Sequence, residues 1–140
     1  MPYSLEAEQS VLGSILIDPE RINEVVGIIR AEDFYLEEHR SIFLAMQDLY
    51  IKNKTIDVVT LIDTLVKNDV YSDEDSRQYI KLIAQVVPSA SNIRDYAQIV
   101  QNKSLLRRLI EVCSEITEDA YAETEDVETL HTSMRRRKRD

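Results

Sequence analysis

The stretch from Asn92 to Ala122 constrains the fold more than any other part of the chain, because it runs for 31 residues without a glycine or a proline. These are the residues that most often bend or end a helix. Two apolar stripes with helical spacing follow one another along it: Ile93, Tyr96, Ala97 and Val100, then Leu106, Leu109, Ile110, Cys113, Ile116 and Ala120. A single helix of this length extends about 45 Å, more than one small domain could cover.

The apolar pattern stops between Glu123 and Asp126 and then restarts for a short distance. Thr124 stands where a helix N-cap is expected. The restarted stripe consists of Val127, Leu130, His131 and Met134. We therefore predict that residues 91–134 form a helical hairpin, a long helix followed by a short return helix.

The short arm is too small to cover the long helix, so part of the hairpin is predicted to remain exposed. Contiguous exposed apolar surface usually marks an interface. A second copy of the same chain is the simplest partner to cover it. The predicted oligomer interface consists of Leu105, Leu106, Leu109, Ile110, Cys113, Ile116, Val127 and Leu130.

Residues 1–90 are predicted to form a globular head of five packed helices. Ser4, Asp18 and Asp57 stand at N-cap positions, Pro19 follows as a first helical residue, and Pro88 stops the fifth helix. The acidic segment 68–76 is interpreted as an exposed loop. Apolar residues recur with helical spacing at Leu5, Val11, Leu12, Ile15, Leu16, Ile22, Val25, Val26, Ile29, Ile42, Ala45, Met46, Leu49, Val58, Leu61, Ile62, Leu65, Tyr79, Ile80, Ile83 and Val87.

The expected fold class is all-α, since no segment alternates apolar and polar residues as a half-buried strand does and the chain has only 2 Gly and 3 Pro. Phe34 and Phe43 are the expected core anchors. Gly13 lies inside a helical stripe, where the missing side chain would let a neighbouring helix approach closely.

The net charge of −9 is unevenly distributed. Residues 135–140 hold five basic side chains and one acidic one, whereas the first 134 residues hold 12 basic and 25 acidic ones, a net charge of −13. An acidic body repels phosphates, so little or no direct DNA binding is expected of the folded part. The basic residues 135–140 are predicted to be a tail that is disordered or foreign to the domain.

The sequence gives no sign of a catalytic, cofactor or metal site. The phosphate-binding pattern Gly-x-x-x-x-Gly-Lys-Ser/Thr is absent, because Gly13 and Gly27 are the only glycines. Cys113, His39 and His131 are isolated in the sequence rather than spaced as metal ligands. Cys113 is interpreted as a small buried hydrophobic residue and His39 as a surface or capping residue. The single cysteine and the lack of an apolar run of about 18 residues fit a cytoplasmic protein and no membrane span.

Several segments, taken in order, resemble the N-terminal domain of bacterial replicative DNA helicases, the DnaB family. The first is Ser4–Leu16 with its Glu6-Ala7-Glu8 block. The others are Asp33-Phe34-Tyr35 followed by His39-Arg40-Ser41-Ile42-Phe43; Ile56–Leu61 followed by Leu65; Tyr79 with Leu82 followed by Ser89–Val100; and Arg107 and Arg108 before Leu109-Ile110. Matches in register across about the first 120 residues are far more specific than any one of them.

The resemblance implies a globular head and a hairpin through which copies pair, with three pairs forming a collar on a ring-shaped hexamer. It also implies that the collar recruits primase, through residues that the sequence does not identify. The ATPase motor, with its ATP and Mg²⁺, would follow in the full protein, so this part is expected to be an assembly and docking domain rather than an enzyme. The alternatives are the helicase-binding domain of a primase and an unrelated small helical enzyme or regulator.

Overall fold

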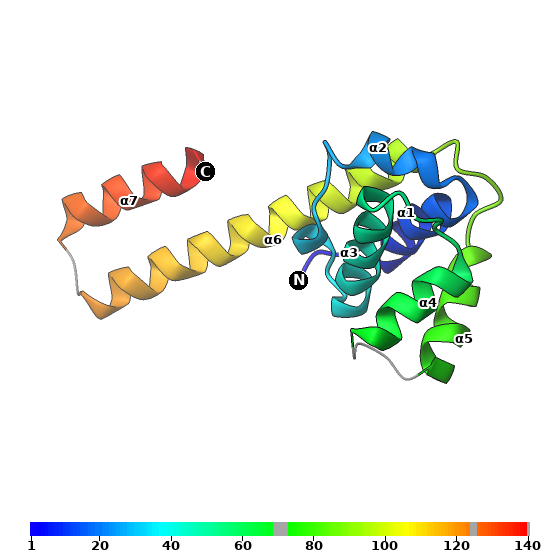
Figure 1. Ribbon diagram of the computed structural model, residues 1–140. Helices are drawn as coiled ribbons and strands as arrows, with labels where there is room; N and C mark the ends of the chain where they lie inside the picture. The colour runs from blue at the N-terminus through cyan, green and yellow to red at the C-terminus, as the bar shows by residue number, and fades with distance from the viewer. Residues whose placement is uncertain (69–72, 124–125, 140) are drawn as a thin grey trace.

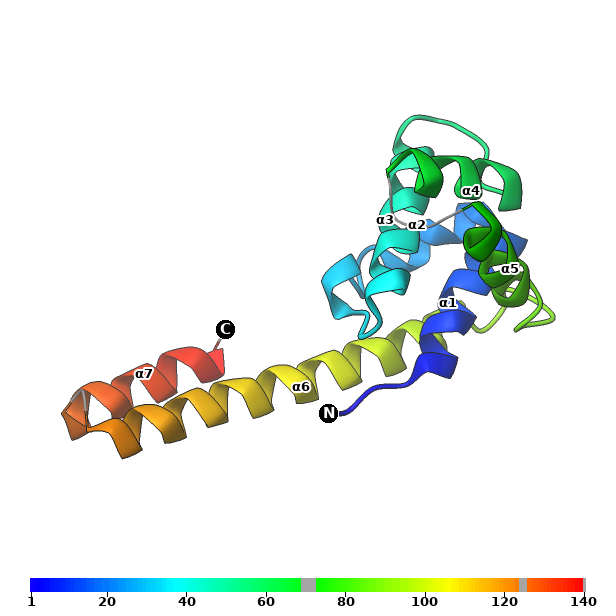
Figure 2. The same cartoon turned by 90° about the horizontal axis from the view of Figure 1, so that it is seen from below.

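The computed structural model describes residues 1–68, 73–123 and 126–139, and every regular element in that part of the chain is helical. Helices α1–α5 gather with the start of α6 in a head, α6 leaves the head, and α7 folds back along it (Figures 1 and 2). The predicted all-α head and hairpin are thereby confirmed. The elements are α1 (Leu5–Ile17), η1 (Pro19–Arg21), α2 (Ile22–Val25), η2 (Ala31–Asp33), α3 (Glu37–Ile51), α4 (Val58–Lys67), α5 (Asp73–Ala84), α6 (Ile93–Ala122) and α7 (Val127–Arg139), where η marks a 3₁₀ turn.

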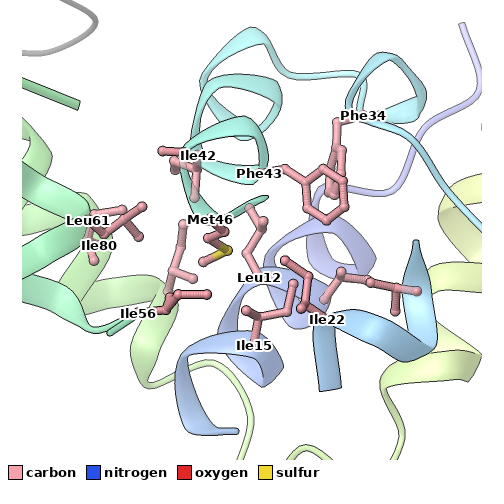
Figure 3. Packing of buried hydrophobic residues seen from close by; sticks show 14 of the residues in the cluster. Leu12, Ile15, Ile22, Phe34, Ile42, Phe43, Met46, Ile56, Leu61 and Ile80 are labelled. Atoms are coloured by element: carbon pink, nitrogen blue, oxygen red, sulfur yellow. The ribbon is translucent and has the colours of Figure 1, made fainter. Parts of the chain in front are cut away.

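The head has one continuous apolar core to which α1–α5 and the first turns of α6 contribute. Figure 3 shows part of this core, including Leu12 of α1, Ile22 of α2 and Phe43 of α3. Phe34 and Phe43 are fully buried, with ring centroids 5.2 Å apart, as expected of the core anchors. Burying a side chain of this size contributes about 1.5–3 kcal/mol. Ile93, Ala97 and Val100 of α6 belong to the same core, so α6 is part of both the head and the hairpin.

Gly13 lies where α1 packs on α5. A Cβ atom at this position would be 2.6 Å from the carbonyl oxygen of Ile83, closer than real Cβ contacts allow. The predicted role of Gly13 in a close helix–helix approach is confirmed, and the contact is with the backbone of α5 itself.

Two of the three N-caps predicted in the head make a side-chain capping hydrogen bond. The Ser4 hydroxyl accepts a hydrogen bond from the Ala7 N–H at 3.2 Å, and the Asp57 carboxylate accepts one from the Thr60 N–H at 2.8 Å. Asp18 makes no capping bond, because its carboxylate binds the Arg21 guanidinium at 3.3 Å instead. Asp18 therefore occupies the predicted N-cap position, before Pro19, but its side chain makes no capping hydrogen bond.

The second predicted helix is shorter than its apolar spacing suggested. Pro19 starts a 3₁₀ turn, and α2 then lasts only from Ile22 to Val25. Ile22, Val25 and Ile29 are buried as expected, but Val26 is 49% exposed because the helix has ended before it. The prediction of a buried Val26 is wrong.

The bounds of α5 also differ from the prediction. The helix already begins at Asp73, so the predicted loop at 68–76 is wrong from 73 onward, and residues 69–72 lie outside the described part. It ends at Ala84, before Pro88. Val87 is buried as predicted, but it lies in the turn after α5 and not in the helix. Pro88 disfavours helical backbone angles at the residue before it, which is Val87.

The hairpin turns at Glu123, whose φ of 51° is left-handed and ends α6. Thr124 lies outside the described residues, and the observed cap of α7 is Asp126, whose carboxylate accepts the Thr129 N–H at 2.7 Å. This hydrogen bond lowers the pKa of Asp126. The basic residues 135–139, for which a disordered or foreign tail is predicted, continue α7 to Arg139.

Candidate interaction surface of the hairpin

The exposed apolar surface of α6 begins where the helix leaves the head. Leu105, Leu106, Leu109 and Ile110 are between 44% and 53% exposed, and Cys113 is also exposed. We call these five residues the hairpin stripe. Its distal half borders a shallow groove of about 530 Å³ that Ser114, Thr117 and Glu118 complete. Five large or polarisable side chains of one helix are thus left without a full covering.

The other predicted interface residues lie around the hairpin stripe rather than in it. Ile116 and Leu130 are half-buried in the part of the hairpin where α7 runs beside α6. Val127 is 85% exposed, at the start of α7 near the tip of the hairpin. The structure therefore brings Leu105, Leu106, Leu109, Ile110 and Cys113 together on one face of α6. Ile116 of α6 and Leu130 of α7 lie instead where these two helices run side by side.

Cys113 is exposed, so the interpretation of this residue as buried is wrong. The reason is that α7 covers only one side of α6 and Cys113 lies on the side that remains open. Within the described ranges, no group of three or more His, Cys, Asp or Glu side chains is placed to hold a metal ion. None of the described helices is long and apolar enough to cross a membrane.

The head contains a buried polar network that the sequence analysis missed. The Glu8 carboxylate of α1 accepts hydrogen bonds from the Tyr35 N–H at 2.8 Å and the Leu36 N–H at 3.3 Å, just before α3 begins. It also lies 2.8 Å from Nδ1 of His39, whose Nε2 lies 2.6 Å from the Tyr79 hydroxyl. Glu8 and His39 are both almost completely buried. The interpretation of His39 as a surface or capping residue is therefore wrong.

Spacing could have revealed the network. Glu8 is three residues before Val11 and four before Leu12, and His39 stands in the same relation to Ile42 and Phe43. A polar residue in phase with a buried apolar stripe points into the core, where it requires a partner. The charged neighbours Glu37 and Glu38 indicate a surface position for His39, whereas its helical phase indicates a buried one.

The Tyr79 hydroxyl closes the network on the α5 side. Burial raises its pKa, and the negative charges of Glu38 and Glu8 act in the same direction, while the hydrogen bond from Gln9 opposes them. The phenol consequently stays protonated and available as a hydrogen-bond donor or acceptor. The network ties α1, α3 and α5 together, and its buried groups satisfy one another. This is the arrangement of a structural site.

A comparison with protein families decides what kind of head and hairpin this is. The family model described as the DnaB-like helicase N-terminal domain matches residues 1–102. The chain belongs to this family. The match excludes the alternative that the head is the helicase-binding domain of a primase or an unrelated helical enzyme.

Among curated relatives of this DnaB-family domain, the replicative DNA helicase DnaC of Bacillus subtilis (strain 168) is 37% identical over 129 residues, which cover 92% of this chain and 28% of the relative. The replicative DNA helicase DnaB of Pasteurella multocida is 40% identical over 120 residues, or 86% of this chain and 26% of the relative. The chain thus spans little more than a quarter of the length of these relatives, and the helicase motor domain is not among its 140 residues.

Two solved structures are similar to it over most of their length. The N-terminal domain of DnaB helicase from Mycobacterium tuberculosis matches with a TM-score of 0.89 and 33% identity, over 97% of this chain and 96% of that one. The N-terminal domain of DnaB helicase from Helicobacter pylori, described together with its interactions with primase, matches with a TM-score of 0.69 and 26% identity, over 83% and 90% of the two chains. Both comparisons support the DnaB-type head and hairpin.

Proposed function

We propose that this chain is the assembly and primase-docking domain of a hexameric replicative DNA helicase, acting in DNA replication and primosome formation. The observation that carries the proposal is the half-exposed hairpin stripe in a domain of the DnaB family. Pairing of two hairpins would cover it, and three such pairs would form the collar of the full hexamer. The domain itself performs no reaction in this scheme.

The chemistry of the hairpin stripe suits a second copy of the same surface. A two-fold interface brings the same patch of both copies together, so a single contact covers the hairpin stripe of each copy. Burying the exposed half of each side chain contributes on the order of 1 kcal/mol, which over five residues in each copy supports association at micromolar concentration. The net charge of −13 in the first 134 residues opposes it. We therefore expect association to strengthen as salt rises.

Primase docking is proposed because the Helicobacter pylori relative was described with its interactions with primase. The acidic body of this chain favours a partner surface with basic residues. We expect the mass of the domain in solution to increase when a primase C-terminal domain is added, with binding that weakens as salt rises. A mass unchanged at concentrations well above micromolar would exclude docking by this domain alone.

The expected ligands differ between this domain and the motor domain of the full protein. ATP and Mg²⁺ are proposed to bind in the motor domain of the full protein, and no cofactor in these 140 residues. Any affinity for DNA is expected to come from the basic end of α7, residues 135–139, and to fall steeply with salt. As part of a replicative helicase, the chain is proposed to act in the cytoplasm.

A further inference from the structure

The part of α6 next to the head is held by polar contacts rather than by the apolar core. Its buried residues are Ile93, Ala97 and Val100, and among the described residues of α6 none after Val100 is buried. Gln101, Ser104 and Arg107 follow at intervals of three residues, so they lie on one face of the helix. We call these three residues the polar clasp.

Each residue of the polar clasp donates a hydrogen bond to a segment of the head that is not an α-helix. The Gln101 amide donates to the carbonyl oxygen of Ile28 at 2.9 Å, and the Ser104 hydroxyl donates to the Asp33 carboxylate at 2.7 Å. The acceptors lie in the connection between α2 and α3. The clasp therefore binds the head outside its α-helices, at backbone and side-chain acceptors of this connection.

Arg107 makes the largest set of contacts. Its guanidinium donates to the carbonyl oxygen of Asp33 at 2.7 Å and to that of Pro2 at 2.9 Å. It also lies 5.4 Å from the centroid of the Tyr35 ring, and Tyr35 in turn stacks on Tyr3 at 4.3 Å between centroids. A guanidinium held by two carbonyl oxygens and a ring face has a fixed position and orientation. One side chain of α6 thereby joins the N-terminal segment, the α2–α3 connection and the hairpin.

Asp33 is the residue of the head that accepts hydrogen bonds from two residues of the polar clasp. One carboxylate oxygen accepts from Ser104 and the other from the Arg30 N–H at 2.7 Å, while its carbonyl oxygen accepts from Arg107. The same residue thus organises the turn η2 and receives two of the three clasp residues. A displacement of α6 would have to break these bonds together.

We propose that the polar clasp sets the angle at which the hairpin leaves the head, with Arg107 as the principal positioning residue. Without the clasp, α6 is held in the head by only the two turns that carry Ile93, Ala97 and Val100. The helix runs about 20 Å beyond Arg107, so a small rotation at the clasp becomes a large displacement at the tip. Hydrogen bonds to carbonyl oxygens can be lost without opening the apolar core, which makes this contact a suitable hinge. The proposal concerns the isolated chain and does not rest on the proposed function.

The test measures the distance between the head and the hairpin by pulsed electron–electron double resonance. Cys113 is replaced by serine, and nitroxide labels are attached at Lys81→Cys in α5 and Ser114→Cys in α6, both exposed positions. Labelled protein is diluted with unlabelled protein so that distances between copies do not contribute. The unmodified clasp is expected to give one narrow distance distribution. Arg107→Gln is expected to broaden it and shift its mean.

Arg108→Gln is the matched control, because it removes the same charge from an exposed neighbouring residue outside the clasp. It is expected to leave the distribution unchanged. Ser104→Ala removes a single hydrogen bond and should broaden the distribution less than Arg107→Gln. The proposal is overturned if Arg107→Gln and the combined Gln101→Ala, Ser104→Ala, Arg107→Gln variant keep the narrow distribution. It is also overturned if Ser104→Ala or Arg107→Gln unfolds the head, because the contact would then hold the fold rather than the angle.

Discussion

The head and the hairpin contain similar apolar residues but bury them in different ways. In the head, Leu12, Ile15, Phe34 and Phe43 are completely buried within one chain, whereas Leu109 in the hairpin remains 53% exposed. The head therefore has an intramolecular source of stability, and the hairpin stripe has apolar surface left for another molecule. One amphipathic pattern can therefore specify a core or an interface, depending on how much chain remains to cover it.

The largest expected effect is a difference in lost stability when one large apolar side chain is truncated in the head and another in the hairpin. Phe34→Ala creates a cavity in the head and is expected to lower the free energy of unfolding by about 3–5 kcal/mol. Leu109→Ala is expected to lower it by less than about 1 kcal/mol when the chain is monomeric. Thermal unfolding at low protein concentration compares the two. Equal losses would show that the hairpin stripe is an internal core and would abolish the distinction.

Inside the head, the buried polar network and the exposed surface differ in the same way. Glu8→Gln removes the negative charge that faces His39 and two backbone N–H groups, and we expect a loss of about 1–3 kcal/mol of stability. Glu6→Gln, an exposed change two residues earlier, is the control and should alter stability by less than about 0.5 kcal/mol. Chemical denaturation measures both. If the two variants are equally stable, the network contributes nothing specific to the head.

The sequence predicts regular apolar elements better than polar contacts between distant segments. The absence of glycine and proline from Asn92 to Ala122 indicated the long helix, and its second stripe indicated the exposed leucines. The pairing of Glu8 with His39 joins residues 31 positions apart, and neither periodicity nor composition specifies which polar side chains meet. The contacts of Arg107 with Pro2 and Asp33 depend on the same long-range geometry.

Local signals also competed with one another at the ends of elements. The acidic segment before Tyr79 suggested a loop, but α5 begins at Asp73, since helix formation there is favoured by packing against α4. The basic run after Met134 suggested disorder, but α7 continues to Arg139. Charge alone does not distinguish the two states, because a solvated helix face and a solvated loop can have the same composition.

The smallest expected effect concerns the cap of α7. The lowered pKa of Asp126 means that its carboxylate stabilises the helix when ionised, so this contribution is present above the ordinary value of 3.8 and is lost as the pH falls through the lowered value. Asp126→Ala should reduce the helicity of α7 at pH 7 and have no effect at strongly acidic pH. Cα chemical shifts of residues 127–134 measure this. A loss of helicity that is the same at both pH values would contradict the capping role, and the shifts of α1 serve as an internal control.

A matched pair of charge insertions tests whether the hairpin stripe pairs two copies of the chain. Leu109 on α6 and Leu44 on α3 are 53% and 55% exposed, so a glutamate at either position meets a similar environment within one chain. Sedimentation equilibrium measures the mass of each variant at micromolar concentration, and circular dichroism measures its helical content. Leu109→Glu is expected to reduce the mass to that of one chain while keeping its helical content, and Leu44→Glu is expected to keep the oligomer. An unchanged mass for Leu109→Glu, or an equal loss in both variants, would contradict pairing through the hairpin.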